Sequence, residues 1–476
     1  MLDITNLTIK SAHNHLKNGD FSVKDLVGSA LKNVDEKNKE INAYLEVYND
    51  VKEETAKAES LFKGGKASIL TGIPLALKDN ILNKGKIASA SSKILGKYHA
   101  TYDSTVVSKL KKESPIFIGR TNMDEFAMGS STENSAYGVT KNPIDPTRVP
   151  GGSSGGSVAA VKMNGALAAL GSDTGGSIRQ PASFCGLVGL KPTYGAISRY
   201  GLIAMGSSLD QIGPLTKSVE DAEILFNIMK GKDPKDSTTI SSVEKKELPK
   251  KLIIGVPEDV LKMDGIQPDV RKNFEESIKK FSKLGYEIKN ISLPNAHYSL
   301  AIYYVIMPAE VSSNLARFDG VKYGLHENGE NLLGDYIKTR TIGFGKETRR
   351  RLILGAYVLS SGYYDSFYNK ANELRRAVIG DFDKVFENRQ AKNGVDIIIT
   401  PTTPDVAFKI GEKAADPLSM YMSDILTAPQ SIAGLPAISV PSGLSQIGLP
   451  IGLQITAPYM REDLLFKAGK DFLGEI

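Results

Sequence analysis

Two glycine- and serine-rich clusters lie close together in this sequence. The first is PGGSSGGS, residues 150–157, and the second is GSDTGGSIRQP, residues 171–181. Glycine at this density allows positive φ angles and brings backbone amides close to a reacting atom. Such clusters are typical of turns. A serine in such a turn has N–H donors beside it, so Ser153 and Ser177, 24 positions apart (177 − 153), are candidate nucleophiles.

A serine needs a base before it can attack, and the sequence offers a lysine for this role. The five histidines lie outside both clusters, which argues against a Ser-His-Asp triad. Lys78 ends the segment GIPLALKDN, residues 72–80, which is typical of a short buried strand. Burial lowers the pKa of a lysine and can make it neutral, and only a neutral lysine acts as a base.

Each of these features also has a simpler interpretation. Lys78 alone could be a strand-end lysine paired with Asp79 or another acid. The first cluster could be a flexible loop or a phosphate cradle, although no lysine follows Gly156 as in phosphate-binding loops. The second cluster alone could be a tight turn.

The order of predicted elements favours an α/β layered fold. A possible capping box at Ser22–Asp25 begins one of the helices expected over 1–63. Pattern alone leaves open whether the two halves, on either side of the polar stretch 231–250, share one sheet. The other predicted elements are strand-like segments to about residue 216, a helix over 218–230, a βαβ unit over 252–291, long helices over 297–317 and 345–388, and strands at 395–400, 437–440 and 451–455.

Composition excludes several classes of protein. The single cysteine, Cys185, rules out an internal disulfide and a cysteine-based zinc site. The net charge of +5 comes from scattered lysines and arginines mixed with acids, which is typical of solvated helix faces rather than a nucleic-acid stripe. The start of the chain is polar, and no apolar run reaches the roughly 18 residues of a membrane helix. We therefore expect a cytoplasmic protein without a membrane partner.

The motifs IPLALKDN, PGGSSGGS and GSDTGGSIRQPA, in this order and spacing, resemble the amidase signature family, whose members hydrolyse C–N amide bonds. The resemblance implies that Ser177 is the nucleophile, Ser153 a bridging serine and Lys78 the base, with a cis peptide bond before Ser153. It also implies an oxyanion hole formed by the backbone N–H groups of Ser177 and of Thr174, Gly175 and Gly176. Ser172 and Asp173 are expected to support the site or the fold, and Arg179 to orient the loop or pair with an acid.

Further stretches are similar to the glutaminase subunits of tRNA-dependent amidotransferases, a group within that family. They are NMDEFAMG (122–129), SSLDQIGP (207–214), NLARFDG (314–320) and GFGKE (343–347). Because the similarity covers both halves, it implies one α/β/α domain over 1–476 with a mixed central sheet covered by helices. Its parts would be N-terminal helices over 1–63, a catalytic core over 64–230 and a substrate-recognition half over 251–476.

This resemblance also implies a function and partners. The chain would release ammonia from glutamine within a heterotrimer that also contains B and C subunits. These partners would use the ammonia to convert Glu-tRNA(Gln) to Gln-tRNA(Gln). The tRNA, ATP and magnesium would be bound mainly by the partner, leaving this chain without a cofactor or metal.

Free glutamine needs a cation for its α-carboxylate and an anion for its α-ammonium group. By resemblance these are Arg351 and Asp424, with Tyr303 and Gly129 as further substrate contacts. From the residues alone, Arg351 in RRRL would be a solvated helix arginine and Asp424 a helix-surface acid.

Two other functions compete with the glutaminase hypothesis. A free-standing amidase acting on small neutral amides would use the same three catalytic residues but would not need Arg351 and Asp424. A non-catalytic scaffold would need none of Lys78, Ser153 and Ser177. The presence of all five residues favours a glutaminase.

Overall fold

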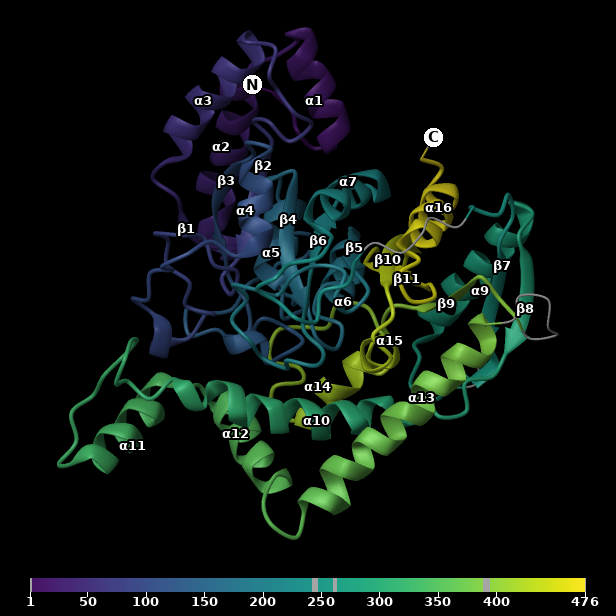
Figure 1. Ribbon diagram of the computed structural model, residues 1–476. Helices are drawn as coiled ribbons and strands as arrows, with labels where there is room; N and C mark the ends of the chain where they lie inside the picture. Colours follow the sequence, from purple (N-terminus) through teal and green to yellow (C-terminus); the bar gives the residue numbers. More distant parts are fainter. Residues whose placement is uncertain (1, 242–246, 260–262, 388–393, 476) are drawn as a thin grey trace.

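One mixed sheet of eleven strands runs through the described part of the chain, which comprises residues 2–241, 247–259, 263–387 and 394–475 in a computed structural model (Figure 1). Neighbouring strands run parallel in two separate groups of three and antiparallel elsewhere in the sheet. In spatial order the strands are β1 (Tyr44–Val47), β3 (Ile116–Thr121), β2 (Pro74–Lys78), β4 (Ala168–Asp173), β6 (Gln211–Thr216), β5 (Val188–Lys191), β10 (Ala437–Leu444), β11 (Pro450–Thr456), β9 (Ile397–Pro401), β7 (Ile253–Pro257) and β8 (Glu287–Ile291).

The two halves of the chain share this sheet. Strand β5 of the first half pairs antiparallel with β10 of the second half, with Leu190 opposite Ile438. The sheet is therefore continuous across the polar stretch 231–250, of which residues 242–246 lie outside the described residues. The question that pattern alone left open is answered, and the prediction of a layered α/β fold with a mixed sheet is confirmed.

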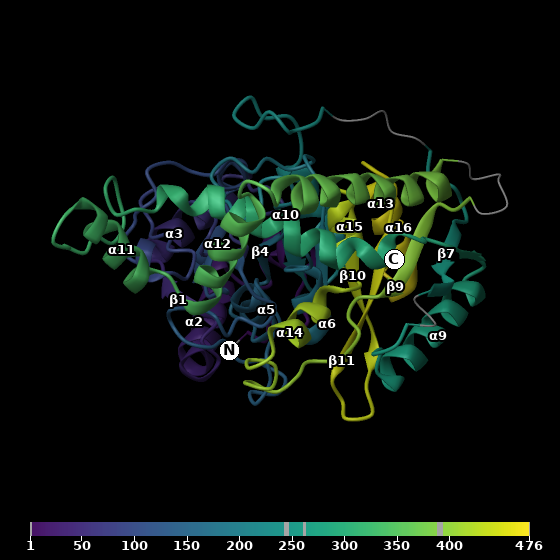
Figure 2. The ribbon, with the colours of Figure 1, turned by 90° about the horizontal axis from the view of Figure 1, so that it is seen from below.

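Helices cover the sheet, and a group of long helices lies along one side of the molecule (Figures 1 and 2). None of the helices in the described residues is both long enough and apolar enough to span a membrane. The helices are α1 (Ile9–Asn18), α2 (Val23–Ile41), α3 (Val51–Lys63), α4 (Thr105–Lys111), α5 (Gly155–Lys162), α6 (Arg179–Cys185), α7 (Val219–Met229), α9 (Pro268–Lys283), α10 (Ser299–Asn314), α11 (Leu332–Gly343), α12 (Lys346–Val358), α13 (Lys370–Phe386), α14 (Pro417–Tyr421), α15 (Ala428–Ile432) and α16 (Glu462–Leu473).

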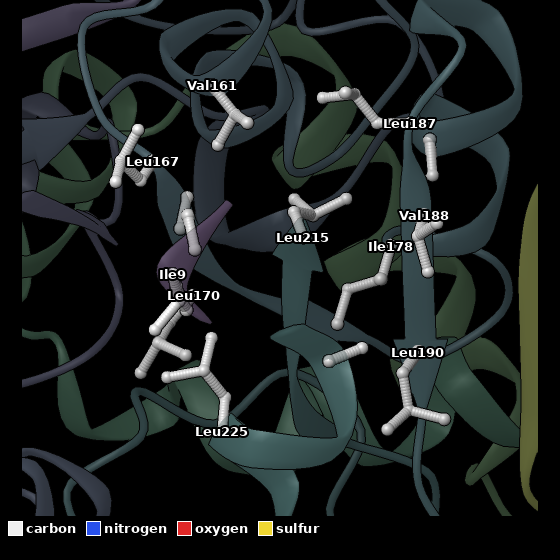
Figure 3. Close-up of a cluster of buried hydrophobic side chains, with 14 of the residues drawn as sticks. Ile9, Val161, Leu167, Leu170, Ile178, Leu187, Val188, Leu190, Leu215 and Leu225 are labelled. Carbon is white, nitrogen blue, oxygen red and sulfur yellow. The ribbon is translucent and has the colours of Figure 1, made fainter. Parts of the chain in front are cut away.

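The core of the first half of the chain is built from strands β4, β5 and β6 and the helices that pack on them (Figure 3). Leu170, Leu190 and Leu215 come from the three strands and are fully buried, as is Ile178 immediately before α6. Burying one such side chain contributes about 1.5–3 kcal/mol. The loops that leave these strands therefore start from a rigid platform.

Most predicted elements form, with three differences. The stretch to about residue 216 was expected to be strand-like, but it also contains the helices α4, α5 and α6. The capping box is present, because the Ser22 hydroxyl accepts the Asp25 N–H and the Asp25 carboxylate accepts the Ser22 N–H. The prediction that 1–63 is helical throughout is wrong at β1, where Asn42 takes a left-handed conformation, ends α2 and lets the chain pair with β3. The helical run over 345–388 is divided between α12 and α13 near Gly362, which has a φ of +88°.

Candidate active site

The sheet brings Lys78 and the second glycine-serine cluster to one edge. Strands β2 and β4 are parallel neighbours, with Leu77 opposite Leu170. Because neighbouring parallel strands end at the same edge of a sheet, Lys78 at the end of β2 lies beside Ser172 and Asp173 at the end of β4. The predicted short buried strand ending at Lys78 is confirmed.

Lys78 is fully buried and hydrogen-bonded to serine oxygens. Its Nζ lies 2.8 Å from Ser153 Oγ, 2.9 Å from Ser154 Oγ, 2.9 Å from Ser172 Oγ and 3.2 Å from the Ser172 carbonyl. The Ser154 hydroxyl donates to the Ser172 carbonyl and the Ser172 hydroxyl accepts from Asn80, so both hydroxyl oxygens can accept from the lysine. If Lys78 is neutral and donates its N–H groups to Ser154 and Ser172, its nitrogen lone pair can accept a hydrogen bond from the Ser153 hydroxyl.

Burial lowers the pKa of Lys78 to about 7, against the opposing influence of Asp124, Asp173 and Asp210. Each of these carboxylates is bonded to other groups. Asp124 accepts backbone N–H groups of Thr132 at 2.8 Å and of Asn134 at 3.1 Å. The charges therefore act on the lysine without a direct ion pair among the described residues, and Lys78 can be neutral near neutral pH.

Ser177 is the outermost of the three predicted catalytic residues. It is 8% exposed, whereas Ser153 and Lys78 are fully buried. The Ser154 N–H donates to the Ser177 carbonyl at 3.2 Å, which joins the two clusters, and the Gly152–Ser153 peptide bond is cis. The Ser177 hydroxyl makes no hydrogen bond within the described residues.

The turn before Ser177 presents backbone donors. Within the described residues, the N–H groups of Gly175, Gly176 and Ser177 donate no hydrogen bond. The Thr174 hydroxyl donates to Asp210 at 2.7 Å, and the Gly175 carbonyl accepts from the Thr427 hydroxyl at 2.6 Å, so the start of the turn is held by two hydrogen bonds. A Cβ on Gly175 would lie 2.8 Å from the Tyr303 ring, which explains the glycine. Such preorganised donors can stabilise an oxyanion.

Asp173 and Arg179 form a fully buried ion pair behind this turn. Arg179 Nη2 lies 2.9 Å from Asp173 Oδ1 and Nε lies 3.0 Å from Oδ2. Burial acts to raise the pKa of Asp173. The charge of Arg179 and its hydrogen bonds have the opposite effect, and the pKa of Asp173 stays below its ordinary value. Arg179 also donates to the Thr427 carbonyl and to Gln454, so it ties the nucleophile turn to the second half of the chain.

Arg351 points inward, unlike its neighbour in the basic run. Its side chain is 3% exposed and that of Arg350 is 40% exposed. Arg351 Nε donates to Glu347 Oε1 at 2.8 Å, and its guanidinium lies 5.4 Å from the ring centres of Tyr304 and Tyr421. The interpretation of Arg351 as a solvated arginine is therefore wrong.

Asp424 is likewise buried rather than a surface acid. It accepts the Ser130 hydroxyl at 2.9 Å and the Tyr304 hydroxyl at 3.4 Å. Burial raises the pKa of Asp424 to about 7, while the Ser130 hydrogen bond and Arg351 oppose that shift. A bound cation would therefore favour its ionised form.

The predicted substrate-binding residues fall on different parts of one region. Gly129 and Arg351 line a common cavity of about 90 Å³ together with Ser131, Glu347 and Tyr421. Tyr303 is buried beside Gly175 rather than among the residues that line this cavity, while Asp424 reaches the same region through Tyr304, whose ring stacks on Tyr421. Within the described residues no group of three or more His, Cys, Asp or Glu side chains could hold a metal ion.

Several residues of this site were not assigned a role from the sequence. Ser154 contacts Lys78, Ser130 contacts Asp424, and Glu347 pairs with Arg351. Ser154 and Ser130 stand beside residues that the motifs singled out, and Glu347 is one helical turn before Arg351. Opposite charges four residues apart on a helix could have predicted the ion pair between Glu347 and Arg351.

Comparison with known proteins identifies the class. The family model described as Amidase matches residues 25–466. The chain belongs to the amidase family, which confirms the resemblance based on its motifs.

Individual relatives share a more specific name. The chain is 48% identical to the A subunit of the glutamyl-tRNA(Gln) amidotransferase of Desulfatibacillum aliphaticivorans over 98% of this chain and 96% of the relative. It is 51% identical to the A subunit of the same name from Thermodesulfovibrio yellowstonii over 92% and 91%. The crystal structure of the glutamyl-tRNA(Gln) amidotransferase A subunit from Thermotoga maritima superposes with a TM-score of 0.82 at 40% identity, covering 100% of this chain and 96% of that one.

The pKa of Lys78 predicts how the reactivity of Ser177 depends on pH. An uncharged sulfonyl fluoride should modify Ser177 at a constant rate above neutral pH, and about tenfold more slowly for each pH unit below about 7, because protonated Lys78 cannot accept a proton. The reagent has no ammonium group, so titration of Asp424 does not affect its binding. Lys78→Met should abolish this dependence, and a wild-type rate that stays flat between about pH 5 and 8 would exclude Lys78 as the base.

Proposed function

We propose that the chain is the glutamine-hydrolysing A subunit of a glutamyl-tRNA(Gln) amidotransferase. The observation that carries this proposal is that a buried cation, Arg351, and a buried anion, Asp424, both contact Tyr304. Opposite charges of this kind suit the α-carboxylate and α-ammonium groups of a free amino acid. The relatives named as A subunits of this amidotransferase, at about half identity over nearly the whole chain, support the same substrate.

The ammonium-binding end of this site is coupled to the nucleophile turn. The Thr427 N–H donates to the Asp424 carbonyl at 3.1 Å, and the Thr427 hydroxyl holds the Gly175 carbonyl. Binding of the amino-acid end at Asp424 would therefore orient the side-chain amide toward Ser177. Positioning of this kind supplies much of the rate enhancement of enzymes.

The proposed reaction passes a proton from Ser177, the most exposed of the three residues, through Ser153 to Lys78. Neutral Lys78 takes the Ser153 proton while Ser153 takes the Ser177 proton, and Ser177 Oγ attacks the side-chain carbonyl carbon of glutamine. Backbone N–H groups of residues 174–177 stabilise the oxyanion. The proton returns to the departing nitrogen, ammonia leaves, and water then hydrolyses the γ-glutamyl ester of Ser177 to give glutamate.

A free-standing amidase acting on small neutral amides is the alternative. The fold allows it, because a peptide amidase from Stenotrophomonas maltophilia superposes with a TM-score of 0.82 at 25% identity, covering 99% of this chain and 97% of that one. A neutral amide would leave Arg351 and Asp424 buried without a substrate group to bind. The glutaminase function uses both, so we favour it.

The proposed partners are the B and C subunits of a heterotrimer. ATP and magnesium would act on the partner, which would also bind most of the Glu-tRNA(Gln). Large exposed apolar side chains on α11 and α12 support an association with another protein chain, since such patches mark interaction sites. Leu333 is 66% exposed, Ile337 59% and Ile353 72%, and a groove of about 350 Å³ runs beside Ile337 and Ile353.

Replacing the nucleophile separates ammonia production from ammonia use. Ser177→Ala should lower glutamine-dependent formation of Gln-tRNA(Gln) by several orders of magnitude in the assembled complex. Formation with added ammonium chloride should stay near the wild-type rate, because the partner's site is intact. Loss of both activities would show that Ser177 does more than release ammonia.

The apolar surface of α12 provides a test of assembly. Ile353→Asp should weaken binding to the B and C subunits by about tenfold or more, because a charge replaces buried apolar surface in the complex. Ile447→Asp is the matched control, since Ile447 is 65% exposed but lies on the β10–β11 hairpin. Equal affinities of the two variants in sedimentation experiments would place the interface elsewhere.

A further inference from the structure

A buried carboxylate that the proposed reaction does not use, Glu125, holds the helix on one side of the cavity lined by Arg351. Glu125 follows β3 within the motif NMDEFAMG, and it is 3% exposed. Its Oε2 accepts the Gly345 N–H at 2.7 Å and the Thr348 hydroxyl at 2.6 Å, and its Oε1 accepts the Ser92 hydroxyl at 2.5 Å. Glu125 therefore caps the first turn of α12.

The same helix carries the substrate-binding arginine. Gly345 precedes α12, Thr348 lies in its first turn, and Arg351 follows three residues after Thr348. A negative charge at a helix N-terminus interacts favourably with the helix dipole and satisfies N–H groups that have no partner within the helix. Phe126 adds a packing contact, since its ring lies 5.7 Å from that of Phe344, just before the helix.

The residue before Glu125 holds another part of the cavity lining. Asp124 accepts the N–H groups of Thr132 and Asn134, which fold the segment that contains Gly129 and Ser131. Gly129 and Ser131 line the same cavity of about 90 Å³ as Arg351. Two adjacent carboxylates thus hold two parts of the cavity lining. Asp124 holds the loop that contains Gly129 and Ser131, and Glu125 holds the start of α12.

We infer that Glu125 is a positioning residue that sets the place of Arg351 through α12, and so determines the affinity of the enzyme for the α-carboxylate of its substrate. This inference rests on the proposed glutaminase function. Glu125 touches neither the substrate nor the reacting atoms. Its loss should therefore weaken substrate binding more than it slows the chemical step at Ser177.

The test compares ligands that differ in one charged group. Glutaramate keeps the carboxylate of glutamine and lacks the ammonium group, whereas 4-aminobutanamide keeps the ammonium group and lacks the carboxylate. For Glu125→Gln, we expect the KM for glutamine and the inhibition constant of glutaramate to rise about tenfold. The kcat for glutamine and the inhibition constant of 4-aminobutanamide should change less than about twofold.

Two further variants separate positioning from general stability. Thr348→Val removes the donor on the helix side and should reproduce the change in KM even if Glu125→Gln folds poorly. Asp221→Asn is the matched control, because Asp221 is a buried carboxylate that accepts the Ile9 N–H at the start of α1. It should lower the melting temperature without changing the KM.

A double-mutant cycle with Arg351→Ala tests the coupling of the two residues. If Glu125 acts through Arg351, the KM of the double variant should match that of Arg351→Ala alone, because no cation is left for Glu125 to position. Additive effects, an unchanged KM in both Glu125→Gln and Thr348→Val, or equal weakening of both analogues would overturn the inference while leaving the proposed function intact. A wild-type enzyme that did not hydrolyse glutamine would overturn both.

Discussion

The site depends on a lysine that is buried without an ion-pair partner among the described residues. Lys78 Nζ contacts hydroxyl and carbonyl oxygens, and burial lowers its pKa to about 7. A carboxylate in direct contact would keep the lysine charged and useless as a base. The nearby acids are instead engaged elsewhere: Asp173 pairs with Arg179, and Asp210 accepts from Thr174. The same hydrogen bonds that hold the proposed oxyanion turn thus keep these carboxylates out of direct contact with Lys78.

A second constraint joins the two halves of the chain. The nucleophile turn belongs to the first half, while Arg351 and Asp424 belong to the second. The shared sheet places the halves together through β5 and β10, and Arg179 fixes them locally through the Thr427 carbonyl and Gln454. In the proposed reaction, recognition of the amino-acid end and attack on the amide would therefore use residues placed by one continuous sheet, although these residues are up to 346 positions apart in sequence (424 − 78).

The surroundings of Lys78 were more predictable from the sequence than those of Arg351 and Asp424. The strand that ends at Lys78 is a local pattern and forms as expected. The turns before Ser153 and Ser177 also form, but each cluster runs on into a helix, α5 or α6, which the glycine content did not predict. The inward orientation of Arg351 and the burial of Asp424 depend on Tyr304, Tyr421 and Glu347, which meet only through tertiary packing. Composition and periodicity favoured surface positions for both, and the family resemblance alone indicated otherwise. Strand β1 was missed because a four-residue edge strand carries little periodic signal.

The proposed chemistry is tested most directly by trapping the covalent intermediate. Wild-type enzyme would be mixed with glutamine, quenched in acid within the first turnover and digested, and the peptides analysed by mass spectrometry. We predict a γ-glutamyl group on Ser177, and no such adduct in Lys78→Met under the same conditions. An adduct on Ser153, or on any residue other than Ser177, would contradict the assignment of nucleophile and base.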